Sequence, residues 1–292
     1  MQEIINALGS RVLECFRKRK SIKAKERAVS KQYMKRFGRK LNWDNPTLYT
    51  EKINYAKIHK ATPQKAMLSD KYSVRDWVKE KVGEQYLIPL LGVYDSFNQI
   101  DFDTLPEQFV IKCSHDCGSV KVIKDKSKIN KKKLSIWYSI KLKSNYAYRI
   151  YEMQYETIKP RLLIEKYMED SNVGELRDYK FICLNGKPLY CWVDMDRFDG
   201  HKRVIYDMNW ERAPFNQTFP DGELIEKPAC FDELKDIASK LCEGFDQVRV
   251  DLYEVENRPY FGEMTFTSAN GMGIIRPEEW DEKLGKMWNF TK

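Results

Sequence analysis

Two carboxylates near the end of the chain have the types and spacing of a magnesium site. Asp251 and Glu263 lie in the apolar runs VRVDLY and YFGEM, which the turn-forming ENRP separates. If the runs pair as a hairpin, both carboxylates face one pocket, and Mg²⁺ binds one or two carboxylates together with substrate phosphates. Arg249, two residues before Asp251, shares its strand face, where it would stabilise phosphoryl transfer. An ordinary ion pair of Arg249 with either carboxylate explains these residues equally well.

The segment FVIKCSHDCGSVKVI, residues 109–123, is a candidate for phosphate binding, because two β runs enclose a short polar loop. Gly118 has no side chain, so backbone N–H groups there could approach phosphate oxygens, and Lys112 would add a positive charge. Ser119 ends the same loop. The Walker pattern GxxxxGKS or GxxxxGKT is absent, so this would be a flap of another type. A hairpin with an ion-paired lysine is the simpler alternative.

The segment RLLIEKYM, residues 161–168, is a candidate for adenine binding. Glu165 and Lys166 follow three apolar residues within a predicted strand. Charged groups at the end of a buried run need partners, and the amine and ring nitrogens of adenine could supply them. The case for adenine binding depends mainly on the place of this segment in the chain, between the flap and the carboxylate pair.

The elements that must position these residues follow from hydrophobic periodicity. Helices are predicted over about residues 50–59, 70–82, 131–143 and 231–243. Strands are predicted over residues 86–91, 109–113, 119–123, 161–168, 179–184 and 188–195. Asn185-Gly186 suits a type I′ turn, whose two central residues need positive φ, so the last two strands should pair antiparallel. The mixture predicts an α+β protein with mainly antiparallel sheets.

The charge of the chain is concentrated near its start. The net charge is +8, and residues 11–40 contain thirteen Lys and Arg but two Glu. The remainder is mildly acidic, which argues against a nucleic-acid groove in the body of the protein. Apolar residues recur at helical spacing just before this basic run: Ile4, Ile5, Leu8, Val12, Cys15 and Phe16. Such a helix could lie on an anionic membrane, or it could pack on its own domain.

Cysteine and hydropathy patterns indicate a cytoplasmic protein. Seven Cys are scattered without metal-ligand spacing, and Cys183 and Cys191 lie in apolar runs typical of a core. Three His residues are too few for a His-rich metal site. The first apolar positions are interrupted by Glu3 and Asn6, unlike a signal peptide, and no run approaches the roughly twenty apolar residues of a membrane span.

Taken together, the motifs resemble the TupA-like ATP-grasp family found in bacterial surface-polysaccharide gene sets. The resemblance extends over about residues 40–275 and rests on six blocks in the family's order: NPTLYTEKINYAKIH, LSDKYSVRDWV, FVIKCSHDCGS, RDYKFICLNGKP, VRVDLY and YFGEMTF. It implies an ATP-grasp fold that follows a helical N-terminal segment, with ATP and Mg²⁺ as cofactors.

The resemblance also implies a role for individual residues. Phosphate contacts would come from Lys71 and Lys112, and the flexible flap from Gly118 and Ser119. Glu165, Lys166 and the backbone at Met168 would contact adenine, and Asp178 with Lys180 would line the ribose and phosphate side. Arg249 and Lys112 would act in catalysis, and the metal ligands would be Asp251, Glu263 and Thr265.

Two positions depart from the family pattern. Many ATP-grasp enzymes have Asn two residues after the second metal carboxylate, whereas this chain has Thr265, whose hydroxyl would be the third ligand. The flap is less rich in glycine than expected, and Asp116 brings negative charge near the phosphates.

We expect four segments: a basic amphipathic segment at residues 1–40, a mainly helical subdomain at 41–105, a lid with the flap at 106–165, and a catalytic subdomain at 166–292. The resemblance implies a carboxylate-amine ligase that acts through an acyl phosphate and joins an amino acid to a sugar of a bacterial surface polysaccharide. A glycan kinase, a glycosyltransferase and a nucleotide-binding adaptor remain alternatives. Asp194-Met195-Asp196 is a lone DxD match to glycosyltransferases, more typical of a structural strand. The oligomeric state is not predicted.

Overall fold

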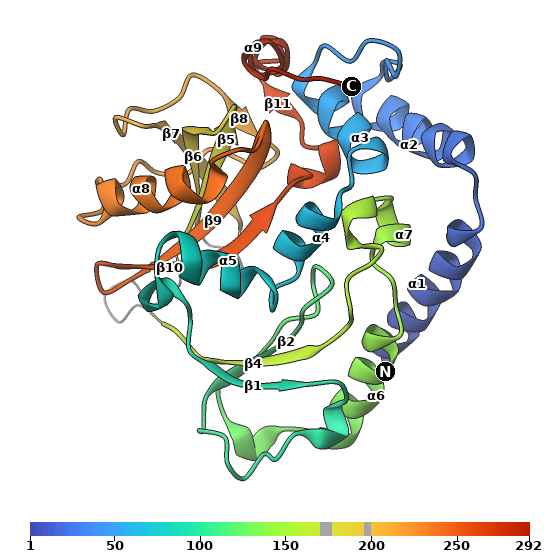
Figure 1. Ribbon diagram of the computed structural model, residues 1–292, viewed down its shortest axis with the longest axis vertical. Helices are drawn as coiled ribbons and strands as arrows, with labels where there is room; N and C mark the ends of the chain where they lie inside the picture. Colours follow the sequence, from blue (N-terminus) through green and yellow to red (C-terminus); the bar gives the residue numbers. More distant parts are fainter. Residues whose placement is uncertain (170–176, 196–199) are drawn as a thin grey trace. The chain divides into compact units, whose positions relative to one another are not determined.

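The computed structural model describes residues 1–169, 177–195 and 200–292, and the chain divides into two compact units (Figure 1). Unit 1 comprises Met1–Glu26, Lys60–Arg75 and Ile88–Met168; unit 2 comprises Arg27–His59, Asp76–Leu87 and Glu169–Lys292. The division into four segments therefore stays a prediction. No helix among the described residues is both long enough and apolar enough to cross a membrane.

Unit 1 is built on a four-stranded antiparallel sheet in the order β1-β4-β2-β3. Its strands are β1 Leu90–Tyr94, β2 Phe109–Cys113, β3 Lys121–Ile123 and β4 Leu162–Lys166. Its helices are α1 Gln2–Lys18, α4 Pro63–Ser69, α6 Lys131–Leu142 and α7 Ala147–Ile150. Two further helices, α2 Ile22–Phe37 and α5 Val74–Lys81, begin in unit 1 and continue in unit 2.

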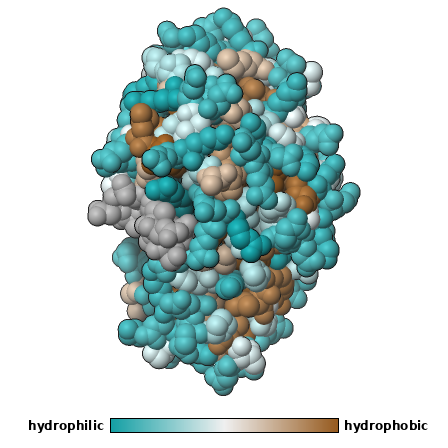
Figure 2. Space-filling model, turned by 90° about the vertical axis from the view of Figure 1, so that its left-hand side faces the viewer, coloured by the Kyte–Doolittle hydropathy of each residue, from teal (hydrophilic) through white to brown (hydrophobic). Residues whose placement is uncertain are grey.

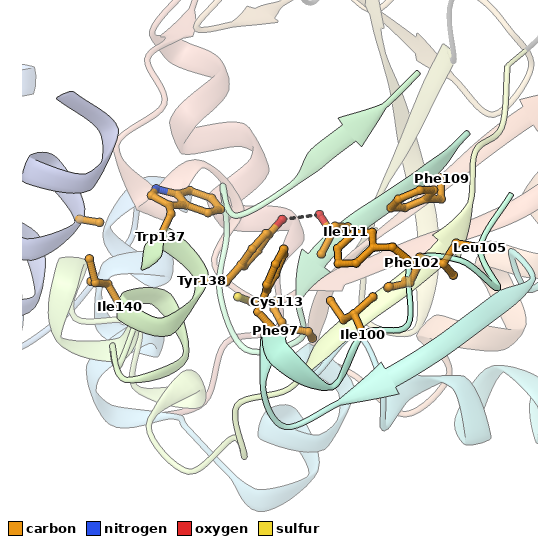
Figure 3. Close-up of a cluster of buried hydrophobic side chains, with 13 residues drawn as sticks. Phe97, Ile100, Phe102, Leu105, Phe109, Ile111, Cys113, Trp137, Tyr138 and Ile140 are labelled. Carbon is orange, nitrogen blue, oxygen red and sulfur yellow. Dashed lines mark hydrogen bonds between the residues drawn. The ribbon is translucent and has the colours of Figure 1, made fainter. Parts of the chain in front are cut away.

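Alternation along β2 gives the unit 1 sheet an apolar face and a polar face. Phe109, Ile111 and Cys113 are buried in a cluster with aromatic residues of α6 (Figure 3). Alternation along the strand directs Lys112 to the other face of the sheet. The hydroxyl of Tyr138 donates to the carbonyl of Ile111 at 2.9 Å, which satisfies the only polar group that this ring brings into the core. The core thus fixes the strand that presents Lys112.

Unit 2 is built on a five-stranded antiparallel sheet in the order β10-β9-β5-β6-β7. Its strands are β5 Arg177–Leu184, β6 Lys187–Met195, β7 Lys202–Asp207, β9 Gln247–Val255 and β10 Arg258–Thr265, beside the short pair β8 Asn216–Gln217 and β11 Ile275–Arg276. Its helices are α3 Tyr49–His59, α8 Phe231–Cys242 and α9 Glu279–Met287.

Helices cover the two faces of this sheet differently. On one face α8 lies across the strands, and its Phe231 stacks with Phe181 of β5 (Figure 1). On the other face Tyr49 of α3 and Leu284 of α9 belong to one buried cluster with Trp192 of β6. Cys183 and Cys191 are buried, as predicted.

The predicted fold class and most predicted elements are confirmed, with two corrections at element boundaries. The helix predicted over residues 70–82 begins only at Val74, because the carboxylate of Asp70 accepts from the Tyr72 N–H at 3.1 Å and the Ser73 hydroxyl at 2.8 Å, forming a turn. The strand predicted over 86–91 is shifted, since β1 starts at Leu90, after Pro89, which lacks an N–H.

Candidate active site

The β9–β10 hairpin places the two predicted metal carboxylates opposite each other. Glu256 and Asn257 form its turn, both with positive φ, as a two-residue turn of type I′ requires. Glu263 pairs with Asp251, and Thr265 pairs with Arg249. Because opposite residues share a face and their Cβ atoms lie about 5 Å apart, all four side chains project from one face of the sheet.

A β-bulge at Gly262 is what brings Glu263 to this face. Phe261 pairs with Leu252 and Glu263 pairs with Asp251, so Gly262 is one extra residue in β10. Without the bulge, the next pair in register would be Gly262 with Asp251, and Glu263 would lie on the α8 face. A Cβ at position 262 would lie 3.0 Å from the Asp251 carbonyl oxygen, so a residue without Cβ suits the bulge.

One guanidinium nitrogen of Arg249 lies close to the side-chain oxygens of all three predicted metal ligands. Its Nη2 atom lies 2.5 Å from Asp251 Oδ2, 3.4 Å from Glu263 Oε1 and 3.2 Å from Thr265 Oγ1. Its Nε also donates to Asp251 Oδ1 at 2.6 Å. A group of three oxygen donors, two of them carboxylates, suits Mg²⁺ chemically. Although burial opposes its charge, the Asp251 carboxylate raises the pKa of Arg249.

Lys180 extends the charged network from β9 to β5. It pairs with Asp251 in the register, and its Nζ donates to Asp251 Oδ2 at 3.1 Å and also to Asp178. Burial disfavours the ammonium, but the carboxylates of Asp178 and Asp251 outweigh it and raise the pKa of Lys180. The structure therefore brings together Arg249, Asp251, Glu263, Thr265, Asp178 and Lys180, which the sequence analysis named separately.

Asp194 continues the same network to β6 and β7, and sequence reasoning missed its partner. Arg203 donates to Asp194 through Nε at 2.6 Å and through Nη2 at 2.9 Å, while its guanidinium lies between the rings of Trp192 and Phe219. Burial opposes the Asp194 charge, but the Arg203 hydrogen bonds lower the pKa of Asp194 to about 2. Asp194 is thus structural here; Asp196, the other half of the DxD match, lies outside the described residues.

In unit 1, Lys112 and Glu165 form a buried ion pair on the polar face of the sheet. Lys112 Nζ lies 2.6 Å from Glu165 Oε2, and the side chains come from the adjacent strands β2 and β4. Arg75 Nη1 lies 3.7 Å from the other oxygen of Glu165, a contact that sequence reasoning missed although SVRDWV supplied the residue. The ion pair that was the simpler alternative for Lys112 is therefore present. It does not exclude phosphate binding, because Lys112 and Arg75 both lie beside Glu165 on the polar face of the sheet.

The predicted flap is the loop between β2 and β3. Lys71 Nζ donates to the Asp116 carbonyl at 2.7 Å. The Ser119 hydroxyl donates to the Asp116 carboxylate and accepts from the Cys113 N–H at 3.0 Å, so this side chain holds the loop in shape. Gly118 has a φ of 92° and no atom within 4 Å of an added Cβ, which leaves its backbone open to a ligand.

The remaining predicted adenine contacts are distributed along and beyond β4. Lys166 is exposed, and alternation directs it away from the buried Glu165; its N–H donates to the Pro89 carbonyl at 2.9 Å. Met168 is half-buried and follows the strand. The structure thus puts Glu165 beside Lys112 but not Lys166.

A cavity of about 610 Å³ lies beside the β8–β11 pair of unit 2. Its lining includes Phe219, Arg276 and the ion pair of Arg212 with Asp221 at 2.9 Å, whereas the ring of Phe215 is buried and stacks on Trp280. Arg203 Nη1 donates to the Gln217 carbonyl at 3.3 Å, so hydrogen bonds lead from the Asp194 pair to the strand beside this cavity. Among the described residues, no group of three or more His, Cys, Asp and Glu side chains is arranged to hold a metal ion.

Comparisons with known proteins identify the family. The model of the family described as TupA-like ATPgrasp matches residues 51–289. None of the curated proteins matches the chain. Among solved structures, D-alanine--D-alanine ligase from Bacillus anthracis complexed with ATP is similar, with 17% identity, coverage of 69% of this chain and 54% of that chain, and a TM-score of 0.41.

L-amino acid ligase from Bacillus licheniformis is similar at 12% identity, with coverage of 84% of this chain and 55% of that chain and a TM-score of 0.45. The present chain therefore spans little more than half the length of these two structures. The family match covers most of the chain and agrees with the two antiparallel sheets. The chain belongs to the TupA-like ATP-grasp family and has the ATP-grasp fold.

Proposed function

We propose that the protein is an ATP-dependent, ADP-forming carboxylate-amine ligase. The observation that carries the proposal is the oxygen cage on the β9–β10 hairpin, where one cationic atom reaches Asp251, Glu263 and Thr265. A cage of this type suits Mg²⁺, and membership of the ATP-grasp family makes ATP the expected nucleotide.

In unit 2, Asp251 and Glu263 would hold Mg²⁺, and the Thr265 hydroxyl would be the third ligand. When bound, Mg²⁺ neutralises charge on the phosphate oxygens of ATP. Arg249 gives up part of its contact with the carboxylates and stabilises charge on the transferring phosphoryl group. Lys180 donates to Asp178 and Asp251 and, with Asp178, would line the ribose and phosphate side.

In unit 1, Lys112 and Lys71 contact the ATP phosphates. Lys112 and Arg75 both lie close to the Glu165 carboxylate, so two cations and one anion leave this polar face with a net positive charge. A positive charge there suits the phosphates of ATP. The open backbone at Gly118 and the Ser119 loop form the flap. Adenine contacts come from Glu165, Lys166 and the backbone at Met168.

The reaction has two steps. A carboxylate oxygen of one substrate attacks the γ-phosphorus of ATP, the bond to the bridging oxygen breaks, and ADP leaves. An amine then attacks the acyl carbon of the acyl phosphate, phosphate leaves with the carbon–oxygen electron pair, and the nitrogen loses a proton to give an amide. The residues named above contribute position and charge rather than a covalent intermediate.

We propose an amino acid and a sugar of a bacterial surface polysaccharide as the two substrates, joined in the cytoplasm at the inner face of the membrane. The cavity beside β8 and β11 supports a sugar, because its lining includes the aromatic ring of Phe219, and Arg276 offers a cation to an acidic group. The neighbours named as D-alanine--D-alanine ligase and L-amino acid ligase support an amino acid partner.

A hydroxylamine assay tests this function. The full chain is incubated with ATP, Mg²⁺, hydroxylamine and a panel of amino acids and uronic acids, and hydroxamate and ADP are measured together. Hydroxamate formed in proportion to ADP, and absent in the Glu263→Gln variant, is the expected result, because hydroxylamine traps acyl phosphates. ADP with a phosphorylated hydroxyl and no hydroxamate would instead assign a glycan kinase.

A further inference from the structure

The N-terminal helix α1 carries an apolar stripe that faces solvent instead of the core. Ile5, Leu8, Val12 and Phe16 are 53, 45, 56 and 67% exposed. At 100° per residue these positions fall within one third of the helix circumference, so they form a continuous strip along about three turns. A soluble helix normally buries such a strip, and the arrangement here is the reverse.

The opposite side of α1 is the one that packs on unit 1. Ala7 and Glu14 are its buried residues, and the helix contacts α6 and α7. Glu14 Oε2 accepts from the Asn145 N–H at 3.1 Å, and Glu3 forms an ion pair with Lys121 at 2.6 Å. Both acidic residues of α1 thus attach it to unit 1, which fixes the apolar stripe in its outward orientation and leaves that stripe without negative charge.

Positive charge lies directly after the stripe. Lys18, Arg19, Lys20 and Lys23 are all exposed, and in the described part of the chain none of them forms an ion pair. Ile22 beside them is exposed as well. The segment from Lys18, at the end of α1, to Lys23, in the first turn of α2, therefore combines the exposed apolar Ile22 with four cations.

We propose that this face of α1 is a docking surface for an anionic lipid bilayer. The apolar stripe, defined by Ile5, Leu8, Val12 and Phe16, lies at the boundary between headgroups and acyl chains, and the basic residues after it contact anionic headgroups. Charge complementarity favours this occupant over a second copy of the chain, which carries the same net charge of +8.

On the face drawn in Figure 2 the surface is mainly hydrophilic, and hydrophobic side chains occur in small separate groups. Docking through α1 would hold the enzyme at an anionic lipid surface.

Vesicle flotation tests the proposal with the full chain. We expect binding to vesicles of phosphatidylcholine with 30% phosphatidylglycerol, weak binding to phosphatidylcholine alone, and a steep loss of binding as salt rises. The double variant Val12→Glu/Phe16→Glu should bind at least tenfold less. The matched control Gln2→Glu/Asn6→Glu adds the same charge at exposed positions of α1 outside the stripe and should stay within about twofold of the wild type.

Melting temperature and ADP release, measured for every variant, separate a docking defect from a folding defect or a loss of the proposed activity. Equal flotation of Val12→Glu/Phe16→Glu and the wild type would overturn the proposal. A second result would also overturn it: the wild type fails to bind vesicles but forms a dimer by light scattering, and the same substitutions convert that dimer to a monomer. The stripe would then bind a second copy of the chain.

Discussion

Asp251 is a buried carboxylate that is stabilised by two neighbouring cations. Its side chain is only 2% exposed, yet Arg249 donates to both of its oxygens and Lys180 to one of them. An unpaired carboxylate at this depth would cost several kcal/mol. The two cations therefore stabilise the folded protein, and a metal ion bound as proposed would compete with Arg249 for the same oxygens. We expect Mg²⁺ to bind mainly with ATP, whose phosphates offer Arg249 an alternative partner.

Lys112→Met tests the phosphate contact in unit 1. Loss of a charge-assisted contact costs about 1.5 to 3 kcal/mol, so the apparent KM for ATP should rise roughly 10- to 150-fold. The control Lys128→Met removes a lysine that is 82% exposed and paired with Asp125. Steady-state kinetics with varied ATP, beside a melting curve for each variant, make the measurement. An unchanged KM and turnover in folded Lys112→Met would leave Lys112 with only its structural pairing to Glu165.

Asp194→Asn tests the buried pair with Arg203. Breaking it should lower the free energy of unfolding by about 3 to 5 kcal/mol at pH 7. The folded pKa of Asp194, about 2, lies below its ordinary value of 3.8. The stabilisation is therefore complete above pH 3.8 and is lost as the pH falls toward 2. Urea unfolding of both proteins should give a constant difference from pH 7 to 5 and a smaller one below pH 4.

Asp236→Asn is the control for that experiment, because its exposed pair with Lys240 should contribute less than about 1 kcal/mol. If the difference between wild type and Asp194→Asn were small at pH 7, or did not change with acid, Asp194 and Arg203 would not form the pair described.

At the scale of elements, the β9–β10 hairpin was predictable but its register was not. The apolar runs and ENRP indicated the two strands and the turn. Counting outward from the turn at residues 256 and 257, however, places Gly262 opposite Asp251, which would send Glu263 to the α8 face. The bulge corrects this by one residue. A bulge depends on packing across the sheet, so periodicity alone could not reveal it.

Substitution of Gly262 tests the bulge without touching either carboxylate. In Gly262→Val the new side chain would crowd the Asp251 carbonyl and the Tyr253 ring. We expect Glu263 to leave its position opposite Asp251 and the Mg²⁺ concentration for half-maximal ADP release to rise about tenfold or more. Deletion of Gly262 is the matched variant, because Glu263 would then follow Phe261 in regular register and stay opposite Asp251.

The deletion should therefore retain a lower Mg²⁺ requirement than Gly262→Val. The opposite order, or no effect of Gly262→Val in a folded protein, would show that the bulge does not determine the position of Glu263.

Across the whole molecule, the sequence predicted those helices, strands and turns that depend on residues close together in the chain. The Asn185-Gly186 hairpin, α3, α6, α8 and the antiparallel sheets agree with the sequence patterns. The turn at Asp70 was missed because it depends on how that carboxylate bonds to nearby groups. Helix α9 was missed although Trp280, Leu284 and Met287 recur at helical spacing. The Lys180 and Asp194 network was missed because its members come from four strands, whose order in the sheet no spacing in the sequence specifies.

The claim that the β9–β10 hairpin holds the catalytic metal is tested most directly by measuring ADP release. The measurement is made at saturating ATP across a Mg²⁺ titration, for the wild type, Glu263→Gln, Asp251→Asn and the double variant. Glu263→Gln is the cleaner change, since Glu263 is 35% exposed, whereas Asp251→Asn also weakens buried ion pairs and should lower the melting temperature. Turnover should fall at least about a hundredfold in each single variant. The double variant should be scarcely worse than the more damaging single one, because the two carboxylates act as one unit. Near-normal turnover with an unchanged Mg²⁺ requirement in folded Glu263→Gln would contradict the account.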